Sequence, residues 1–114
     1  MRSALILALL AATAQAAVPT TCGLNDEYGK ALCAYQRRNF AEAAAGFQGI
    51  VARGEADVQT LRATYFLART EMKRGRFEQA SSLLIRIYSL DKAFYDSWSC
   101  DFLLGECRKA VGKD

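Results

Sequence analysis

Residues 61–80 carry the stretch LRATYFLARTEMKRGRFEQA, and much of it recurs at a fixed offset of 37 residues. Identical residues align at Leu24 and Leu61, Tyr28 and Tyr65, Ala31 and Ala68, Arg37 and Arg74, Phe40 and Phe77, and Ala43 and Ala80. A second step of the same length aligns Leu61 with Trp98, Tyr65 with Phe102, Ala68 with Gly105, and Gly75 with Gly112. A fixed period of this length is typical of stacked supersecondary units. The chain is therefore expected to hold about two and a half such units.

Each unit is predicted to be a pair of antiparallel helices. Apolar residues from Phe40 to Val51 and from Phe77 to Ile87 fall at helical spacings. Helices are also expected over residues 25–38, 58–74 and from about 97 toward 111, with Asn25 and Asp57 as N-caps. No segment alternates with a period of two, so strands are not expected. The prediction is an all-α stack of five helices over residues 25–114.

Three segments within these helices point to a known family. They are RGRFEQA at residues 74–80, which fits a turn between paired helices, FLA at 66–68 with LLG at 103–105, and Leu90-Asp91 at a unit end. Together they resemble the tetratricopeptide repeat family over most of the chain. The period of 37 is longer than the 34 residues usual in that family. Arg37-Arg38-Asn39 also stands where the family's turn glycine is expected.

The first residues predict an exported protein. A positive start at Met1 and Arg2, an apolar run over residues 4–12 and the small residues of Ala14-Gln15-Ala16 are typical of a secretory signal peptide. We expect residues 1–16 to be removed and residues 17–24 to form an extended leader. The apolar run is too short to span a bilayer, so the mature chain is expected to be secreted or periplasmic with no transmembrane segment.

The composition argues against catalysis and nucleic-acid binding. The chain has no histidine, which removes the usual general base near neutral pH and the commonest metal ligand. The net charge of +3 is too small to indicate a nucleic-acid partner. No carboxylate pair is recognisable, and the acidic residues are expected to be solvated or capping charges: Glu42, Glu71, Glu78, Asp101 and Glu106. We therefore expect no enzyme activity, no cofactor and no metal.

Four cysteines in an exported chain indicate disulfides, here assigned to Cys22, Cys33, Cys100 and Cys107. Cys22 in the leader is expected to fold back onto Cys33 in the first helix. A bond between Cys100 and Cys107 requires the last helix to start at Asp101, because two residues seven apart in one helix are about 10 Å apart along its axis. That second pairing stays open at this point.

A basic stripe on the second unit's first helix is the candidate binding site. Arg62, Arg69 and Lys73 share one helical face, and Tyr65 lies beside them. The resemblance implies that this face lines a groove for an extended peptide, with aligned positions that add Tyr28, Tyr35, Phe102 and Lys109. An acidic protein or peptide is the expected partner. The alternative interpretation is an ordinary solvated face.

Two other functions stay open. The last helix, with Phe102, Leu103 and Leu104, has no following helix to cover it, and it could dock on a partner or on a second copy. A disulfide-bonded helical carrier of an apolar ligand is the third possibility, and it would need an enclosed cavity. The small residues at repeated positions predict tight stacking, which disfavours such a cavity.

Overall fold

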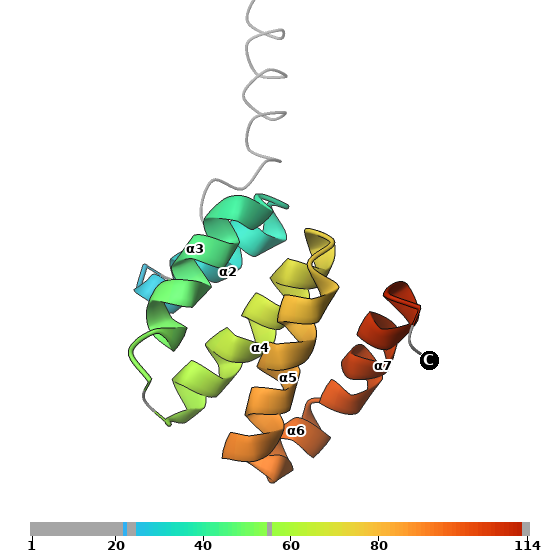
Figure 1. Ribbon diagram of the computed structural model, residues 1–114. Helices are drawn as coiled ribbons and strands as arrows, with labels where there is room; N and C mark the ends of the chain where they lie inside the picture. Colours follow the sequence, from blue (N-terminus) through green and yellow to red (C-terminus); the bar gives the residue numbers. More distant parts are fainter. Residues whose placement is uncertain (1–21, 23–24, 55, 113–114) are drawn as a thin grey trace, which may run out of the picture.

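The described part of the protein is entirely helical, as predicted. The computed structural model describes residues 22, 25–54 and 56–112, and within these ranges it contains no strand. Its helices are α2 (Glu27–Gln36), α3 (Phe40–Val51), α4 (Val58–Lys73), α5 (Phe77–Leu90), α6 (Lys92–Ser97) and α7 (Cys100–Ala110) (Figure 1). The predicted signal peptide and, apart from Cys22, the leader lie outside the described residues.

Side-chain caps fix where most of these helices begin. The Asp57 carboxylate accepts a hydrogen bond from the Thr60 amide at 2.8 Å, which confirms the predicted cap of α4. The first helix is capped by Asp26, not Asn25: the Asp26 carboxylate accepts a hydrogen bond from the Gly29 amide at 2.7 Å, and α2 spans Glu27–Gln36 in place of the expected residues 25–38.

The predicted number of five helices is wrong, because the last unit begins with a separate short helix. Asp91 ends α5 and caps α6, accepting a hydrogen bond from the Phe94 amide at 3.0 Å. The chain then turns at Ser99, whose φ of 54° is left-handed and interrupts the helix before α7. The Trp98 ring stacks on Phe94 with centroids 4.8 Å apart, which holds this turn against α6.

One backbone conformation recurs at the period of the sequence, two residues after the ends of α2, α4 and α7. Arg38, Gly75 and Gly112 stand 37 residues apart, and their φ angles are 64°, 78° and 73°. Each follows the end of a helix, where a left-handed residue closes the last turn. Arginine thus takes the glycine conformation at the position where the sequence lacks the expected glycine.

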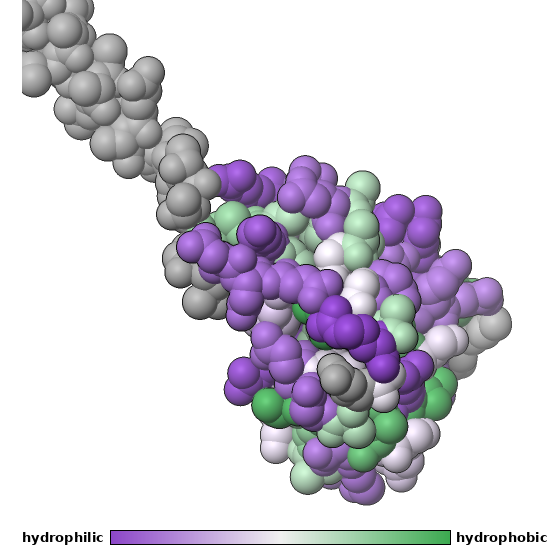
Figure 2. All heavy atoms as spheres, turned by 90° about the vertical axis from the view of Figure 1, so that its left-hand side faces the viewer, coloured by the Kyte–Doolittle hydropathy of each residue, from purple (hydrophilic) through white to green (hydrophobic). Residues whose placement is uncertain are grey.

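The helices form a two-layer stack. Along the chain α2 packs on α3, α3 on α4, α4 on α5 and α5 on α7, while α4 also contacts both α2 and α7. Repeated small residues sit at these contacts, since Ala43, Ala68 and Ala80 are fully buried and a Cβ on Gly46 would lie 2.8 Å from that of Ala31. The end of the stack formed by α2 and α3 is mostly hydrophilic (Figure 2).

Two hydrophobic clusters make up the core. One lies among α2, α3 and α4 around Phe47 and Leu67, and the other lies among α4, α5, α6 and α7 around Leu84 and Ile87. Phe66 packs against both clusters. This ring therefore joins the two halves of the stack.

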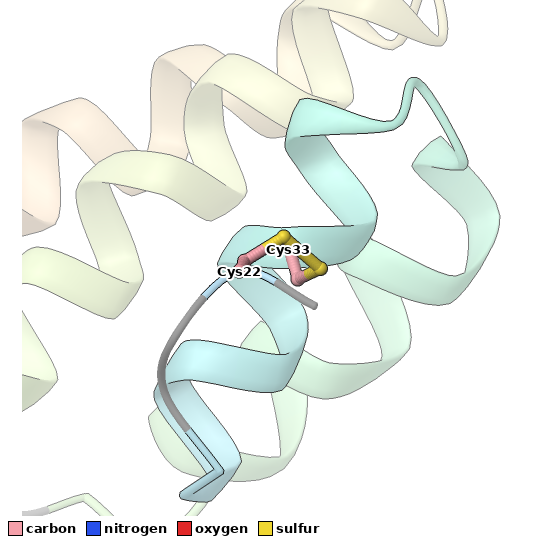
Figure 3. Close-up of a disulfide and its surroundings, with 2 residues drawn as sticks. All are labelled: Cys22 and Cys33. Atoms are coloured by element: carbon pink, nitrogen blue, oxygen red, sulfur yellow. A yellow bond between two sulfur atoms is a disulfide. The ribbon is translucent and has the colours of Figure 1, made fainter. Parts of the chain in front are cut away.

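Cys22 and Cys33 form a disulfide that ties residue 22 to α2, as predicted (Figure 3). The assignment of Cys100 and Cys107 to a disulfide is wrong, because both are free, fully buried thiols. Both belong to the single helix α7, which starts at Cys100, so about 10 Å of helical rise separates them. This distance exceeds the reach of a disulfide.

Candidate functional site

The three predicted cations lie on one face of α4. Arg62 and Lys73 are exposed and Arg69 is partly buried, and their spacing of seven and four residues keeps them in one stripe. None of the three forms an ion pair with a carboxylate in the part of the chain that the structure describes. Their positive charges are therefore not neutralised by described side chains.

Arg69 is held in place by aromatic side chains. Its guanidinium donates a hydrogen bond to the Tyr65 hydroxyl at 3.2 Å and lies over the Tyr65 ring, 5.8 Å from the centroid. Burial works to lower the pKa of Arg69, but the nearby hydroxyls of Tyr65 and Tyr35 outweigh burial, so the pKa is raised. Arg69 thus carries a fixed positive charge between α2 and α4.

A row of aromatic rings accompanies the cations and crosses the stack. Phe66 is its centre: Tyr35 contacts it edge-on at 5.7 Å and Tyr28 at 6.4 Å from α2, and Tyr65 contacts it at 5.1 Å. Tyr65 in turn meets the Trp98 ring at 4.8 Å. We name this region the basic aromatic face, formed by Tyr28, Tyr35, Arg62, Tyr65, Phe66, Arg69, Lys73 and Trp98. Tyr65 is only 8% exposed and belongs to the core beneath the face, where it supports Arg69 and Trp98.

Two of these rings, Phe66 and Trp98, are not among the site residues that the sequence predicts. Both are partly exposed, and both stand in segments that the repeat alignment already singled out. The sequence places Phe66 only in the helix core and Trp98 only at the apolar position that aligns with Leu61. Their partial exposure depends on how α4 meets its neighbours, which the alignment does not contain.

Tyr28 links the first helix to the stripe. Burial raises the pKa of the Tyr28 hydroxyl, and Asp26 adds to this rise, while the nearby Arg62 guanidinium acts in the opposite direction. The opposing effect of Arg62 places its positive charge close to Tyr28. Arg62 and Arg69 of α4 are thus within electrostatic range of Tyr28 and Tyr35 of α2.

A small hollow continues the stripe toward α7. It has a volume of about 240 Å³ and is lined by Arg69, Met72, Lys73, Phe77 and Leu103. Three lining side chains are apolar and two are cationic, so the hollow suits an apolar side chain that is followed or preceded by an acidic group.

Phe102 and Lys109 lie apart from the basic aromatic face. Phe102 is 66% exposed, belongs to neither core cluster and has no ring contact within the described chain. The face of α7 that packs inward carries Cys100, Leu103 and Cys107, and helical spacing puts Phe102 and Lys109 on the other side. The structure brings together six of the eight predicted peptide-binding residues and leaves these two outside.

A larger hollow of about 580 Å³ lies among α3, α4 and α5. Glu71 is at this hollow and is only 6% exposed, which corrects its interpretation as a solvated charge. Its carboxylate pairs with Arg74 at 3.0 Å and with Arg76 at 3.8 Å. The buried charge is thus compensated within the helix pair, and the hollow is separate from the cationic stripe on the other side of α4.

Compared with known proteins, the chain matches no family model, no curated protein and no solved structure. Within the described ranges, no group of acidic or cysteine side chains has the arrangement of a metal site. No described helix is long and apolar enough to cross a membrane.

Proposed function

We propose that this protein is an exported helical-repeat adaptor, similar to tetratricopeptide repeat proteins, that binds an acidic peptide segment on the basic aromatic face. It acts by binding and not by catalysis. The resemblance in sequence supports the repeat class, and the signal-like first residues together with the Cys22–Cys33 disulfide support export to an oxidising compartment.

One observation carries the proposal: three cations lie beside a row of rings, and no described carboxylate pairs with any of them. A solvated helix face is commonly balanced by acidic neighbours at i+3 or i+4, as Lys92 is by Asp96 on α6 at 2.8 Å. The α4 stripe lacks such neighbours. An acidic ligand would supply them through charge-assisted hydrogen bonds.

The rings would supply the remaining contact area. Tyr28, Tyr35, Phe66 and Trp98 are all partly exposed, and rigid aromatic side chains contribute strongly to peptide binding because little side-chain entropy is lost. The hollow beside Leu103 would accept one apolar side chain. The proposed ligand is therefore an extended segment that combines acidic and apolar residues.

The test reverses charge at Arg62 and Lys73, which are exposed, so that the fold is left unchanged. Binding of short fluorescein-labelled peptides rich in glutamate and leucine is measured by fluorescence anisotropy at low and high salt. We expect Arg62→Glu/Lys73→Glu to weaken binding at least about tenfold, from two contacts of about 1 kcal/mol each. Salt should weaken binding to the parent protein.

The control changes net charge equally at other exposed positions. Lys30→Glu/Arg86→Glu uses Lys30, which is on the opposite side of α2 from Tyr28, and Arg86, an exposed residue of α5. It should bind as the parent does apart from a general charge effect. Equal affinity of the parent and Arg62→Glu/Lys73→Glu, with both proteins folded, would refute the proposal.

A further inference from the structure

No described residue covers the face of α7 that points away from the stack. Small residues at the equivalent positions of the earlier helices are covered, since Ala31 is 3% and Ala68 is 0% exposed. At Gly105 an added Cβ would meet no atom of the described residues within 4 Å. Phe102 next to it is 66% exposed. The α2 and α3 end of the stack is mostly hydrophilic (Figure 2), whereas the α7 end presents the exposed Phe102 ring and the open space at Gly105 among charged side chains.

The charges of α7 are arranged around Gly105. Asp101 lies in its first turn, and Arg108 and Lys109 lie in its last turn. All three side chains are exposed, and none of them forms an ion pair with another described residue. This order also suits the helix dipole, because acidic groups are favourable near the first turn and basic groups near the last.

Helical geometry divides these residues into two rows on either side of Gly105. Residues seven apart lie nearly above one another on a helix, so Asp101 and Arg108 form one row and Phe102 and Lys109 form the other. Rotation by 180° about an axis through Gly105 reverses the helix direction and keeps each row on its own side. Each row would then face the same row of a second copy, so that Asp101 lies opposite Arg108 and Phe102 lies opposite Lys109.

We propose that α7 pairs antiparallel with α7 of a second copy of this chain, about a two-fold axis near Gly105. Asp101 pairs with Arg108 of the second copy, and the Phe102 ring packs on Lys109 of the second copy. Gly105 faces Gly105, and the missing side chains let the two backbones approach closely. Because the contact is isologous, each interaction is made twice.

Self-complementarity is the reason to assign a second copy and not a different protein. Asp101, Gly105, Arg108 and Lys109 match their own antiparallel image, while the exposed Glu106, about 100° around the helix from Gly105, lies at the margin of this contact. The helix of 11 residues is about 16 Å long, so it buries less than the roughly 800 Å² per partner of a standard stable interface. The dimer is therefore weak and forms at high protein concentration. It is independent of peptide binding on the basic aromatic face.

Sedimentation analysis over a concentration series, with the Cys22–Cys33 bond intact, tests the pairing. We expect Asp101→Arg and Arg108→Asp each to weaken the dimer at least about tenfold, because each variant opposes like charges at two symmetric places. The double variant Asp101→Arg/Arg108→Asp should dimerise as the parent does. A mixture of the two single variants should form mixed dimers, since each of their pairs again joins opposite charges.

Lys30→Asp, a charge reversal on the far end of the stack, is the matched control and should leave the dimer unchanged. Phe102→Ser should weaken it, and circular dichroism verifies that every variant is helical. A parent protein that stays monomeric at the highest concentration overturns the proposal. A dimer that persists equally in both single charge variants overturns it as well, because its contact would then not be the antiparallel α7 pair.

Discussion

At the scale of single residues, the two free thiols show how burial decides chemistry. Cys100 and Cys107 are both fully buried in the second core cluster. Burial, with a further contribution from Asp101, raises the pKa of Cys100 from 9.0 to about 11. Burial also raises the pKa of Cys107, and the adjacent Glu106 adds to that rise, whereas a hydrogen bond with Ser81 opposes it. Both thiols therefore stay protonated and unreactive near neutral pH.

We expect the native protein to resist alkylation at pH 7 and to show two reactive thiols once unfolded in urea without reductant. Intact mass spectrometry after iodoacetamide treatment counts them. The remaining two cysteines, Cys22 and Cys33, stay in their disulfide. Four reactive thiols in the unfolded protein would contradict the disulfide, and none would contradict the free pair.

The raised pKa of Cys100 makes the free energy of unfolding depend on pH in the alkaline range. The unfolded Cys100 thiol loses its proton above its ordinary pKa of 9.0, while the folded thiol keeps it up to about 11. The unfolded state therefore binds fewer protons in this window, and the free energy of unfolding falls as pH rises through it. Urea unfolding at pH 8, 9 and 10 measures the fall, which should be smaller in Cys100→Ala.

At the scale of elements, the effect of replacing a glycine depends on whether it lies in a turn or inside a helix. Gly75 has a φ of 78° in the turn between α4 and α5, whereas Gly105 is inside α7 with open space where a Cβ would be. The same glycine-to-alanine change therefore has opposite effects at the two positions. Gly75→Ala should destabilise the protein by about 1 kcal/mol, because a side chain disfavours the left-handed conformation.

Gly105→Ala should instead stabilise the protein by up to about 1 kcal/mol, because alanine is the better helix former and meets no neighbour. Urea midpoints of both variants, measured in dilute protein, decide the comparison. If the two substitutions shift the midpoint in the same direction, the assigned backbone conformations are wrong.

At the scale of the whole molecule, Phe66 couples the two halves of the stack. It packs against both core clusters and contacts Phe47, Tyr65 and Trp98. Phe66→Ala should lower the free energy of unfolding by about 3 kcal/mol. It should also broaden the urea transition, because the clusters would then unfold less cooperatively.

Phe102→Ala is the control for this prediction, since it makes the same chemical change at a side chain that is 66% exposed. It should alter stability by less than about 0.5 kcal/mol in dilute protein. Equal losses in the two variants would show that Phe66 has no special coupling role.

Local signals in the sequence determined the helical pairs, the period of 37 residues, the Asp57 cap and the Cys22–Cys33 bond. These features depend on residues near one another in the chain or on a repeated pattern, which a single sequence contains. The stripe of Arg62, Arg69 and Lys73 was visible for the same reason, because residues four and seven apart share a helical face.

Only the tertiary structure decided the features that arise from packing between distant elements. The Ser99 turn separates α6 from α7 and leaves Cys100 and Cys107 in one helix, so they remain free thiols. Glu71 is buried beside the hollow among α3, α4 and α5, and Phe66 and Trp98 belong to the basic aromatic face because α4 and the turn after α6 meet there. These contacts follow from the angles at which helices pack, and no local pattern of residues specifies those angles.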